Sequence, residues 1–354
     1  MRRLISSPIS GAFTVVLFLT AVTTGVARDT SKPAAGGLTP ATLDRLSRLP
    51  GGLAALPSAF PLTPAHAAKV SLGRELFFDK RLSGDRSMSC ATCHDPRFAF
   101  ADGKPLSAGF LGKTLRRHSP TVLNAALTVP QFWDGRAAGL EEQATMPIMS
   151  KDEMNMADET MLVSRLEDDD AYRRAFRAVY GAAPNLKLIA DALVAFEQTL
   201  VTPDAPFDRY VRGDRGALTA QEKRGLALFV GKAACSQCHL GPGFTDGSFH
   251  NLGIPVAPGH PADDGRFEVT KDAKDRGAFK TPTLRNVDRT APYLHDGSMT
   301  TLEEVVDLYN RGGGPGAGKS DLLFELGLTP REKTDLVAFL HSLPGTMPAL
   351  PERR

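Results

Sequence analysis

The chain has 354 residues, of which 42% are hydrophobic and 23% are charged. This composition is typical of a soluble globular protein and excludes a disordered or membrane-embedded chain. The length favours two domains of ordinary size. Lys and Arg total 42 and Asp and Glu total 40, so the formal net charge is only +2. We therefore expect neither nucleic acid nor an anionic membrane as a partner.

The N-terminus predicts an export signal. Arg2 and Arg3 precede an apolar run over residues 11–22, and Gly25-Val26-Ala27 offers a small-residue cleavage site. An uncleaved membrane anchor is the alternative, but the run is shorter than the ~20 residues of a spanning helix. We therefore expect a signal peptide over residues 1–27, a periplasmic location and no membrane span after cleavage.

Helix-start signals recur along the chain, whereas strand signals are scarce. They consist of an N-cap threonine that is followed by proline or paired with a glutamate three residues later: Thr39-Pro40, Thr63-Pro64, Thr219 with Glu222, and Thr329-Pro330 with Glu332. Stretches rich in Gly and Pro at 241–265 and 312–318 predict loops. The expected fold class is mainly α, with long loops.

All four cysteines fall into two copies of one motif, Cys90-Ala-Thr-Cys93-His94 and Cys235-Ser-Gln-Cys238-His239. Exported proteins usually form disulfides with their cysteines. Cysteines three apart on a helical turn, however, direct both sulfurs toward the two vinyl-derived carbons of one porphyrin edge, and the next histidine reaches the iron. The motifs therefore predict two covalently bound haem c groups, with His94 and His239 as axial ligands.

Zinc binding and dithiol chemistry are the alternatives for paired cysteines. A zinc site needs both pairs together, and the roughly 140 residues between them are far outside the usual spacing. A thioredoxin-like redox pair needs a βαβ context, whereas helical patterns flank both motifs. Haem attachment is the stronger interpretation.

A weak internal repeat indicates two similar halves. Gly73-Arg-Glu-Leu-Phe77 precedes the first motif, and Gly225-Leu-Ala-Leu-Phe229 precedes the second. In each half, a helix with Leu-Phe on one face is expected to lead into the haem-binding turn. The helical periodicity is interrupted at 201–216. We therefore predict two cytochrome c-like haem domains, over residues 28–205 and 206–354.

From about Ser71 to about Ser342 the sequence resembles the bacterial dihaem cytochrome c peroxidase family, including its MauG-type members. The resemblance is carried by Leu72-Gly-Arg-Glu-Leu-Phe-Phe-Asp79, Arg81-Leu-Ser-Gly-Asp85, Ser119-Pro-Thr121 with Asn124, Phe132-Trp-Asp-Gly-Arg136, Pro282-Thr-Leu-Arg-Asn286 and His295-Asp-Gly297. It implies that the first haem is the peroxide site and that the second relays or stores oxidising equivalents. The first iron must then be open and the second closed by another ligand, because six-coordinate iron cannot bind peroxide.

The resemblance also assigns catalytic roles. Trp133, the only tryptophan, would carry electrons or holes between the haems; an ordinary core tryptophan is the alternative. Glu153 matches the distal glutamate, and Gln143 the distal glutamine ten residues earlier. Such a glutamate moves a proton between the two peroxide oxygens, and nearby methionines suggest an apolar setting that raises its pKa. A solvated charge beside Lys151 and Asp152 is the alternative.

Phe110 corresponds to the distal histidine of family members that need reductive activation, and phenylalanine cannot ligate iron. We therefore expect an open, five-coordinate first haem. The only nearby candidate for a distal histidine is His118, and it lies where the family often carries the asparagine of an interdomain calcium site, which suggests a structural role instead. The resemblance thus implies one calcium ion, which this departure leaves open.

Side chains at helical spacing follow Thr301: Leu302, Val305, Val306 and Tyr309. This pattern puts Tyr309 on the buried face of a helix. By resemblance, Tyr309 stands where typical peroxidases carry the methionine ligand of the second haem, and tyrosine there is the MauG-type residue. A phenolate ligand lowers the potential. The alternative is a core tyrosine, with the ligand supplied by Met299, His250, His260 or His295.

The sequence thus predicts a periplasmic dihaem c-type peroxidase. It would reduce hydrogen peroxide at the N-terminal haem with electrons relayed through the C-terminal haem from a small redox protein, a cytochrome c or a cupredoxin. MauG-type oxidation of a partner protein and a dihaem electron carrier without catalysis are the alternatives. The carrier predicts two six-coordinate, low-spin irons and no dependence on Glu153.

Overall fold

The computed structural model describes residues 52–56, 63–256, 259 and 262–350. The predicted signal peptide over 1–27, the helix start at Thr39-Pro40 and the candidate ligand His260 lie outside the described residues. Within the described part of the chain, no helix combines the length and the apolar character needed to cross a membrane.

The described chain is mainly helical, as predicted. Its α-helices are α2 (Pro64–Phe78), α3 (Cys90–Cys93), α4 (Leu140–Gln143), α5 (Met146–Met149), α6 (Glu159–Glu167), α7 (Asp170–Tyr180), α8 (Leu186–Glu197), α9 (Pro206–Val211), α10 (Ala220–Val230), α11 (Phe267–Thr270), α12 (Leu302–Asn310) and α13 (Pro330–Leu340). Strands β1 (Phe249–His250) and β2 (Phe279–Lys280) pair antiparallel, with Phe249 opposite Lys280. Helix α9 lies inside the segment 201–216, where an interruption of the helical pattern was predicted.

The predicted helix starts within the described residues are confirmed. The Thr63 side chain accepts a backbone hydrogen bond at the start of α2. Thr219 and Thr329 cap α10 and α13 in capping boxes with Glu222 and Glu332. Each cap satisfies N–H groups that have no partner within the helix, which fixes where the helix begins.

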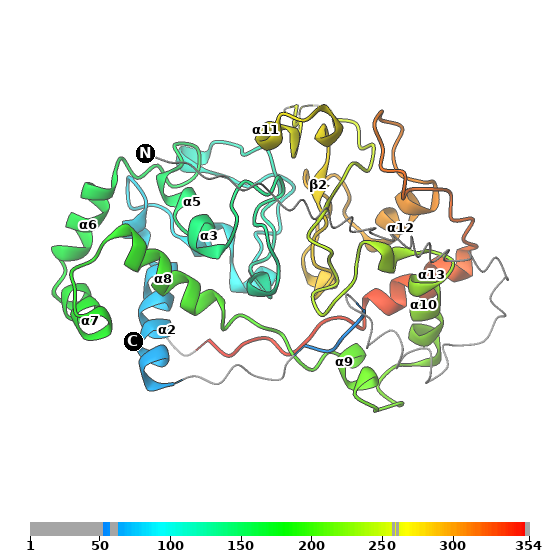
Figure 1. The fold of residues 1–354 in the computed structure, drawn as a ribbon, viewed down its shortest axis with the longest axis horizontal. Helices are drawn as coiled ribbons and strands as arrows, with labels where there is room; N and C mark the ends of the chain where they lie inside the picture. Colours follow the sequence, from blue (N-terminus) through cyan, green and yellow to red (C-terminus); the bar gives the residue numbers. More distant parts are fainter. Residues whose placement is uncertain (1–51, 57–62, 257–258, 260–261, 351–354) are drawn as a thin grey trace, which may run out of the picture. The chain divides into compact units, whose positions relative to one another are not determined.

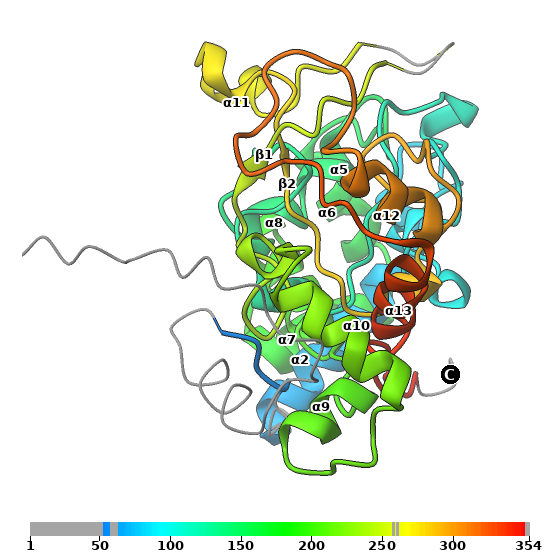
Figure 2. The same cartoon turned by 90° about the vertical axis from the view of Figure 1, so that its right-hand side faces the viewer.

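The internal repeat corresponds to two similar helix pairs, α2 with α8 and α10 with α13 (Figures 1 and 2). A glycine lies at the closest approach in each pair. A Cβ atom at Gly73 would lie 1.8 Å from the carbonyl oxygen of Ala192, and one at Gly225 would lie 2.0 Å from that of Asp335. Any side chain at either glycine would therefore push the two helices apart.

Buried hydrophobic side chains form two clusters. The first draws on residues between 72 and 200, and the second on Leu53 and residues between 207 and 343. Near the C-terminus, Met347 and Leu350 pack against the first cluster. Each end of the described chain thus packs on the half that is distant from it in sequence. Along the sequence, the first cluster ends at Leu200 and the second continues from Phe207, close to the predicted domain boundary. The division into domains stays a prediction.

A buried polar centre joins the two halves at Thr202. Its Oγ1 accepts hydrogen bonds from Asn124 Nδ2 at 2.9 Å and from Asn286 Nδ2 at 2.8 Å. Its N–H donates to Asn124 Oδ1 at 3.0 Å. All three residues are buried. Asn124 and Asn286 follow the equivalent Ser-Pro-Thr and Thr-Pro-Thr stretches of the two halves, so Thr202 is hydrogen-bonded to the matching asparagine of each half.

Charged side chains add a second link. Arg117 forms ion pairs of 2.6 Å with Asp134 from its own half and with Asp263 from the other half. Although burial opposes it, the guanidinium groups of Arg117 and Arg136 hold the pKa of Asp134 below its usual range.

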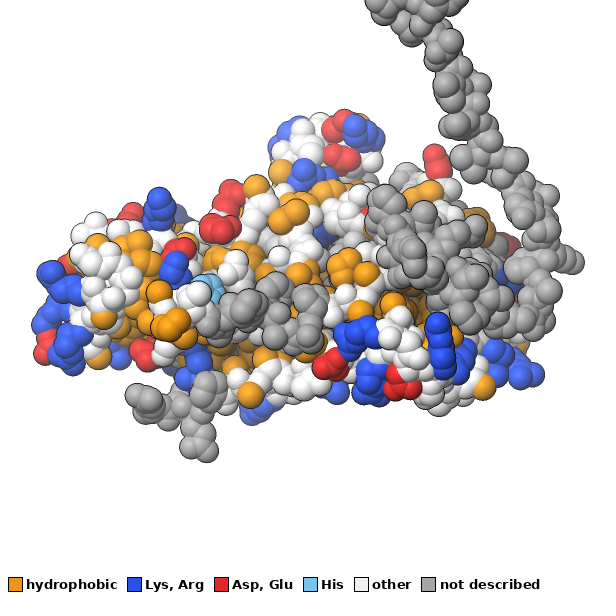
Figure 3. Space-filling model, turned by 60° about the horizontal axis from the view of Figure 1, so that its bottom comes forward, with side chains coloured by type: hydrophobic (Ala, Val, Ile, Leu, Met, Phe, Trp, Pro, Cys, Tyr) orange, Lys and Arg blue, Asp and Glu red, His pale blue; other side chains and the backbone are white. Residues whose placement is uncertain are grey.

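At the molecular surface, Figure 3 shows positive and negative side chains interspersed on one face, in agreement with the near-neutral net charge.

Candidate functional site

The first C-x-x-C-H motif forms helix α3, and His94 follows it directly. Its two cysteines form no disulfide. His94 Nδ1 lies 3.2 Å from the carbonyl oxygen of Phe100. A proton on Nδ1 donates to this carbonyl and leaves Nε2 as the ligand atom. Burial lowers the pKa of His94, so the ring is held neutral, as an iron ligand must be.

The second motif repeats this arrangement with a tighter turn. Residues Cys235–Gln237 form a 3₁₀-helix, and His239 Nδ1 lies 3.0 Å from the carbonyl oxygen of Phe244. Burial also lowers the pKa of His239. Both histidines are therefore oriented by a backbone carbonyl six or five residues ahead.

A cavity of about 910 Å³ lies beside the second motif. The motif contributes Cys235, Cys238 and His239 to its wall, and most of the other lining groups are apolar. The volume is at the upper end of the range for small-molecule sites. A porphyrin is a large, flat and mostly apolar group. It fits this set of lining residues when its thioether edge lies at the two cysteines.

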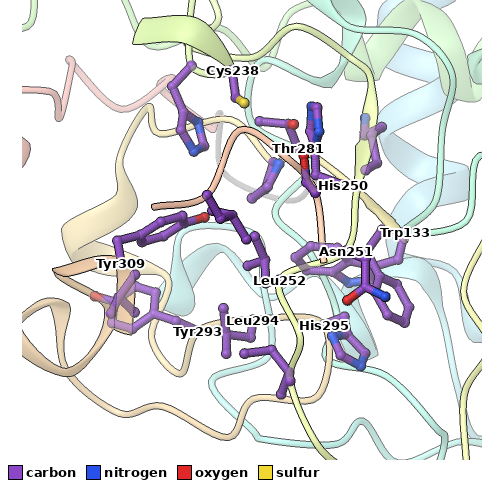
Figure 4. Close-up of a pocket in the computed structure, with 18 of the residues that line it drawn as sticks. Trp133, Cys238, His250, Asn251, Leu252, Thr281, Tyr293, Leu294, His295 and Tyr309 are labelled. Atoms are coloured by element: carbon purple, nitrogen blue, oxygen red, sulfur yellow. The ribbon is translucent and has the colours of Figure 1, made fainter. Parts of the chain in front are cut away.

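Helix α12 supplies the wall that holds Tyr309. The residues predicted to share one face of this helix all line the cavity: Leu302, Val305, Val306 and Tyr309. Figure 4 shows the Tyr309 hydroxyl directed into the cavity. Burial raises the pKa of Tyr309, so the protein alone favours the neutral phenol. A nearby metal cation reverses this preference, because it stabilises the phenolate.

The other candidate ligands of the second haem are placed less favourably. His250 lines the cavity, but its Nε2 lies 3.0 Å from Asp246 Oδ2. His295 also lines it, with its ring stacked on Phe279 at a centroid distance of 3.6 Å. Met299 is not among the described residues that line this cavity.

Trp133 belongs to the first half by sequence and lines the cavity of the second. Its indole N–H donates to the carbonyl of His118 at 2.9 Å. Its carbonyl accepts a hydrogen bond from Lys280 N–H at 2.8 Å, and His118 N–H donates to the carbonyl of His295 at 2.7 Å. The last two bonds cross between the halves, and the first ties the indole to His118, so the indole is fixed at the interface.

His118 marks the place of the predicted calcium ion. Its ring Nδ1 lies 2.8 Å from the carbonyl oxygen of Lys104. Among the described residues, the cluster with metal-ligand spacing is Cys238, Asp246 and His250. That cluster includes a cysteine of the second motif and lies away from the sequence position of the calcium site, so the calcium ion stays a prediction.

Glu153 lies in the turn after α5, where its N–H donates to the carbonyl of Ser150 at 3.2 Å. Burial raises the pKa of Glu153, against the opposing effects of Arg136 and Ser150. The direction agrees with the apolar setting expected from the sequence. Besides burial, Asp102 and Glu153 raise the pKa of the Cys93 thiol, which places Glu153 on the side of the first motif.

The two neighbours expected around Glu153 are also located. Gln143 is the partly buried last residue of α4, a helix that contacts α5. Phe110 lies in the loop 107–115, and its N–H donates to the carbonyl of Asp152 at 2.9 Å. Phe110, which stands where some family members carry a distal histidine, thus lies next to the Glu153 turn. Its side chain has no ligand atom.

Two buried carboxyl groups beside the first motif were missed by sequence reasoning. Glu197, at the end of α8, is 4% exposed, and Asp102 is 5% exposed. Each has one carboxylate oxygen without a hydrogen-bond partner among the described residues. Glu197 adds to burial in raising the pKa of Cys90. No local pattern marks either residue, because their burial arises from packing between distant segments.

Comparison with known proteins agrees with this geometry. Residues 67–216 match the family model of the di-haem cytochrome c peroxidases. Over 302 residues the chain is 43% identical to the methylamine utilization protein MauG of Methylorubrum extorquens, which covers 83% of this chain and 84% of that protein. The chain belongs to the di-haem cytochrome c peroxidase family. The resemblance found in the motifs is thereby confirmed.

Further relatives of the family support the same assignment. Cytochrome-c peroxidase IdrP1 of Pseudomonas sp. (strain SCT) is 40% identical over 317 residues, which covers 81% of this chain and 83% of that protein. The crystal structure of a MauG-like protein associated with microbial copper homeostasis superposes with a TM-score of 0.73 at 34% identity, and covers 84% of this chain and 95% of that one. The chain is therefore a peroxidase-type oxidoreductase of a family that carries two haems.

Proposed function

We propose that this enzyme is an exported, periplasmic peroxidase that reduces hydrogen peroxide at a haem attached to the first motif, with a haem on the second motif as its electron relay. The observation that carries the proposal is the difference between the two sites. Glu153, with a raised pKa, stands on the side of the first motif, and Tyr309 points into the cavity of the second. When bound, the haems supply the redox-active irons that take up the oxidising equivalents of the peroxide.

Attachment and ligation follow from the two motifs. Cys90 and Cys93 would form the thioethers of the first haem, and Cys235 and Cys238 those of the second. His94 and His239 would present Nε2 to the irons, since the carbonyls of residues 100 and 244 hold their Nδ1 atoms. These neutral, pre-oriented rings need no rearrangement to bind iron.

Glu153 would move the proton. As the carboxylate it accepts a proton from the bound peroxide, and as the acid it returns that proton to the departing oxygen, so that water leaves. The raised pKa suits this role, because an acid–base group works best when its pKa approaches the working pH. Gln143, at the end of α4, would supply a hydrogen-bonding amide to the same site.

Tyr309 would close the second iron to peroxide as its sixth ligand, and would lower its potential. Phe110 has no ligand atom, so the first iron would stay open. Trp133 would carry electrons or holes between the two haems, because it lines the second cavity and its indole N–H is hydrogen-bonded to the His118 carbonyl of the first half.

The electron donor would be a small redox protein, a cytochrome c or a cupredoxin. Oxidation of a partner protein, as in MauG-type enzymes, is the second candidate. It is favoured by Tyr309 and by the 43% identity to a MauG protein. Steady-state turnover with hydrogen peroxide and a reduced cytochrome c separates the two: rapid turnover favours the peroxidase, and negligible turnover favours a dedicated partner.

Glu153→Gln tests the mechanism. Loss of acid–base catalysis should lower turnover by about 10²- to 10⁴-fold. Glu167→Gln is the matched control, because it makes the same change at a glutamate that is exposed at the end of α6. Unchanged turnover in Glu153→Gln would remove this residue from the mechanism. Ferric EPR adds a second test: if neither the resting nor the half-reduced protein gives a high-spin signal, the first haem is not open and the electron carrier is favoured.

A further inference from the structure

Lys280 places a positive charge in the wall of the second cavity, and the proposed function leaves this charge without a role. The residue ends β2, and its backbone N–H donates to the Trp133 carbonyl at 2.8 Å. Its Nζ donates to the carbonyl of Pro130 at 2.9 Å. Both ends of Lys280 are therefore held by the segment 130–133 of the other half, which fixes the position of the ammonium group beside the cavity.

The surroundings of this ammonium group lack a matching anion. Burial lowers the pKa of Lys280 to about 8, and no described carboxylate opposes this effect. The carboxylates at the interface are engaged elsewhere, since Asp134 and Asp263 both pair with Arg117. An ammonium group has three N–H donors, of which Pro130 takes one. Because a buried cation without a counter-ion is costly, the site suits an anion that the chain itself does not provide among its described residues.

The geometry of an attached haem indicates which anion this is. Cys235 and Cys238 would hold the edge of the porphyrin that carries the vinyl-derived carbons, and the two propionate carboxylates lie at the opposite edge. In Figure 4, Cys238 lies on one side of the cavity, and Trp133 and His295 lie on another. The Lys280 backbone N–H is hydrogen-bonded to the Trp133 carbonyl, and its Nζ is hydrogen-bonded to the Pro130 carbonyl three residues earlier. The ammonium group is therefore held by the segment 130–133, on the wall that the propionates would reach.

We propose that Lys280 binds a propionate of the second haem, and that this contact positions the haem against Trp133 and raises its midpoint potential. The inference rests on the proposed function, because it requires a haem on His239. A tyrosinate ligand lowers the midpoint potential, whereas the Lys280 charge would raise it. Lys280 would therefore offset part of the decrease in potential caused by Tyr309. A positive charge near the iron stabilises the reduced state, which carries one positive charge fewer.

In the described part of the first half, the position that matches Lys280 carries a histidine. His118 precedes Ser119-Pro-Thr121 as Lys280 precedes Thr281-Pro-Thr283, so the two residues occupy matching positions. The His118 ring is bonded to the Lys104 carbonyl at 2.8 Å. Lys280 therefore distinguishes the second haem from the first, and its effect should be confined to the second.

The test compares the midpoint potentials of both haems in three variants of the full-length holoprotein. Lys280→Gln removes the charge but keeps a donor for Pro130, and Lys280→Arg keeps the charge. Lys271→Gln is the control, since Lys271 is exposed and is not among the described residues that line the cavity. Haem content, measured from the absorbance of the pyridine adduct, is determined first. Wild-type protein without a second haem contradicts the proposed function itself, independently of Lys280.

With two haems present, Lys280→Gln should lower the potential of the second haem only. The expected shift is about tenfold in the reduction equilibrium, or about 59 mV for a one-electron couple. Lys280→Arg and Lys271→Gln should stay close to wild type. An unchanged second potential in Lys280→Gln overturns the proposal, because a purely structural role of Lys280 is retained by glutamine. If that variant does not fold, Lys280→Met provides the same comparison.

Discussion

Replacement of Glu197 by glutamine should stabilise the protein at neutral pH but have no such benefit in acid. Glu197 is 4% exposed at the end of α8, and one of its carboxylate oxygens has no hydrogen-bond partner among the described residues. Burial raises the pKa of Glu197 from the ordinary value of 4.5 to about 8. Between these two values the unfolded chain releases the proton and the folded chain keeps it, so stability falls as the pH rises.

The size of the effect follows from the two pKa values. Each pH unit between them lowers the free energy of unfolding by about 1.4 kcal/mol. At pH 7 the carboxyl group therefore costs the wild type about 3 kcal/mol relative to a pH below 4.5. Glutamine cannot ionise, so Glu197→Gln lacks this loss. Any constant cost of its buried amide is the same at both pH values and cancels in the comparison.

Urea unfolding of both proteins at pH 4.5 and pH 7.5 measures the effect. Relative to the wild type, the unfolding free energy of the variant should increase by about 3.5 kcal/mol between the two pH values. Glu167→Gln serves as the control, because Glu167 is exposed at the end of α6. The reasoning is refuted if the Glu197→Gln difference is the same at both pH values, since Glu197 would then be ionised in the folded protein without cost.

Three further changes test the second site and the interface. Tyr309→Phe should alter the ferric absorption and EPR spectra of the second haem only, and unchanged spectra would contradict ligation by Tyr309. Arg117→Met leaves the buried carboxylates Asp134 and Asp263 without their common partner, so urea unfolding should show a loss of stability of about 3–5 kcal/mol. As a control, Arg116→Met at an exposed arginine should lose less than about 1 kcal/mol. Equal losses in the two variants would show that the buried ion pairs of Arg117 contribute no more than an exposed one. Thr202→Val leaves two buried asparagine amides without their acceptor. Thermal unfolding should show a loss of stability of about 1–3 kcal/mol for each amide. An unchanged Tm would show that water replaces the hydroxyl.

Features set by neighbouring residues could be predicted from the sequence. The threonine caps of α2, α10 and α13 depend on groups within one helical turn, and they lie where expected. The face of α12 that bears Tyr309 follows from helical spacing alone and does line the cavity. The raised pKa of Glu153 was expected from its apolar neighbours, because burial disfavours the ionised form.

Features that depend on distant pairings could not be predicted in this way. The bond from Lys280 to the Trp133 carbonyl joins residues far apart in the chain, and no periodicity encodes it. Thr202 stands in a stretch that reads as a linker, yet it is fully buried between Asn124 and Asn286. Glu197 reads as the polar end of an apolar helix, and only the packing of α2 on α8 reveals its burial.

The crossed ends of the described chain bear on how the two halves would behave if separated. The Ala54 carbonyl accepts a hydrogen bond from Arg285, and Thr346 N–H donates to the carbonyl of Pro203. A fragment that ends at residue 205 would lack Met347 and Leu350, and a fragment that starts at residue 206 would lack Leu53. Each fragment would expose apolar surface that the other covers. The two haem sites are thus expected to mature and to be lost together, as parts of one cooperative unit.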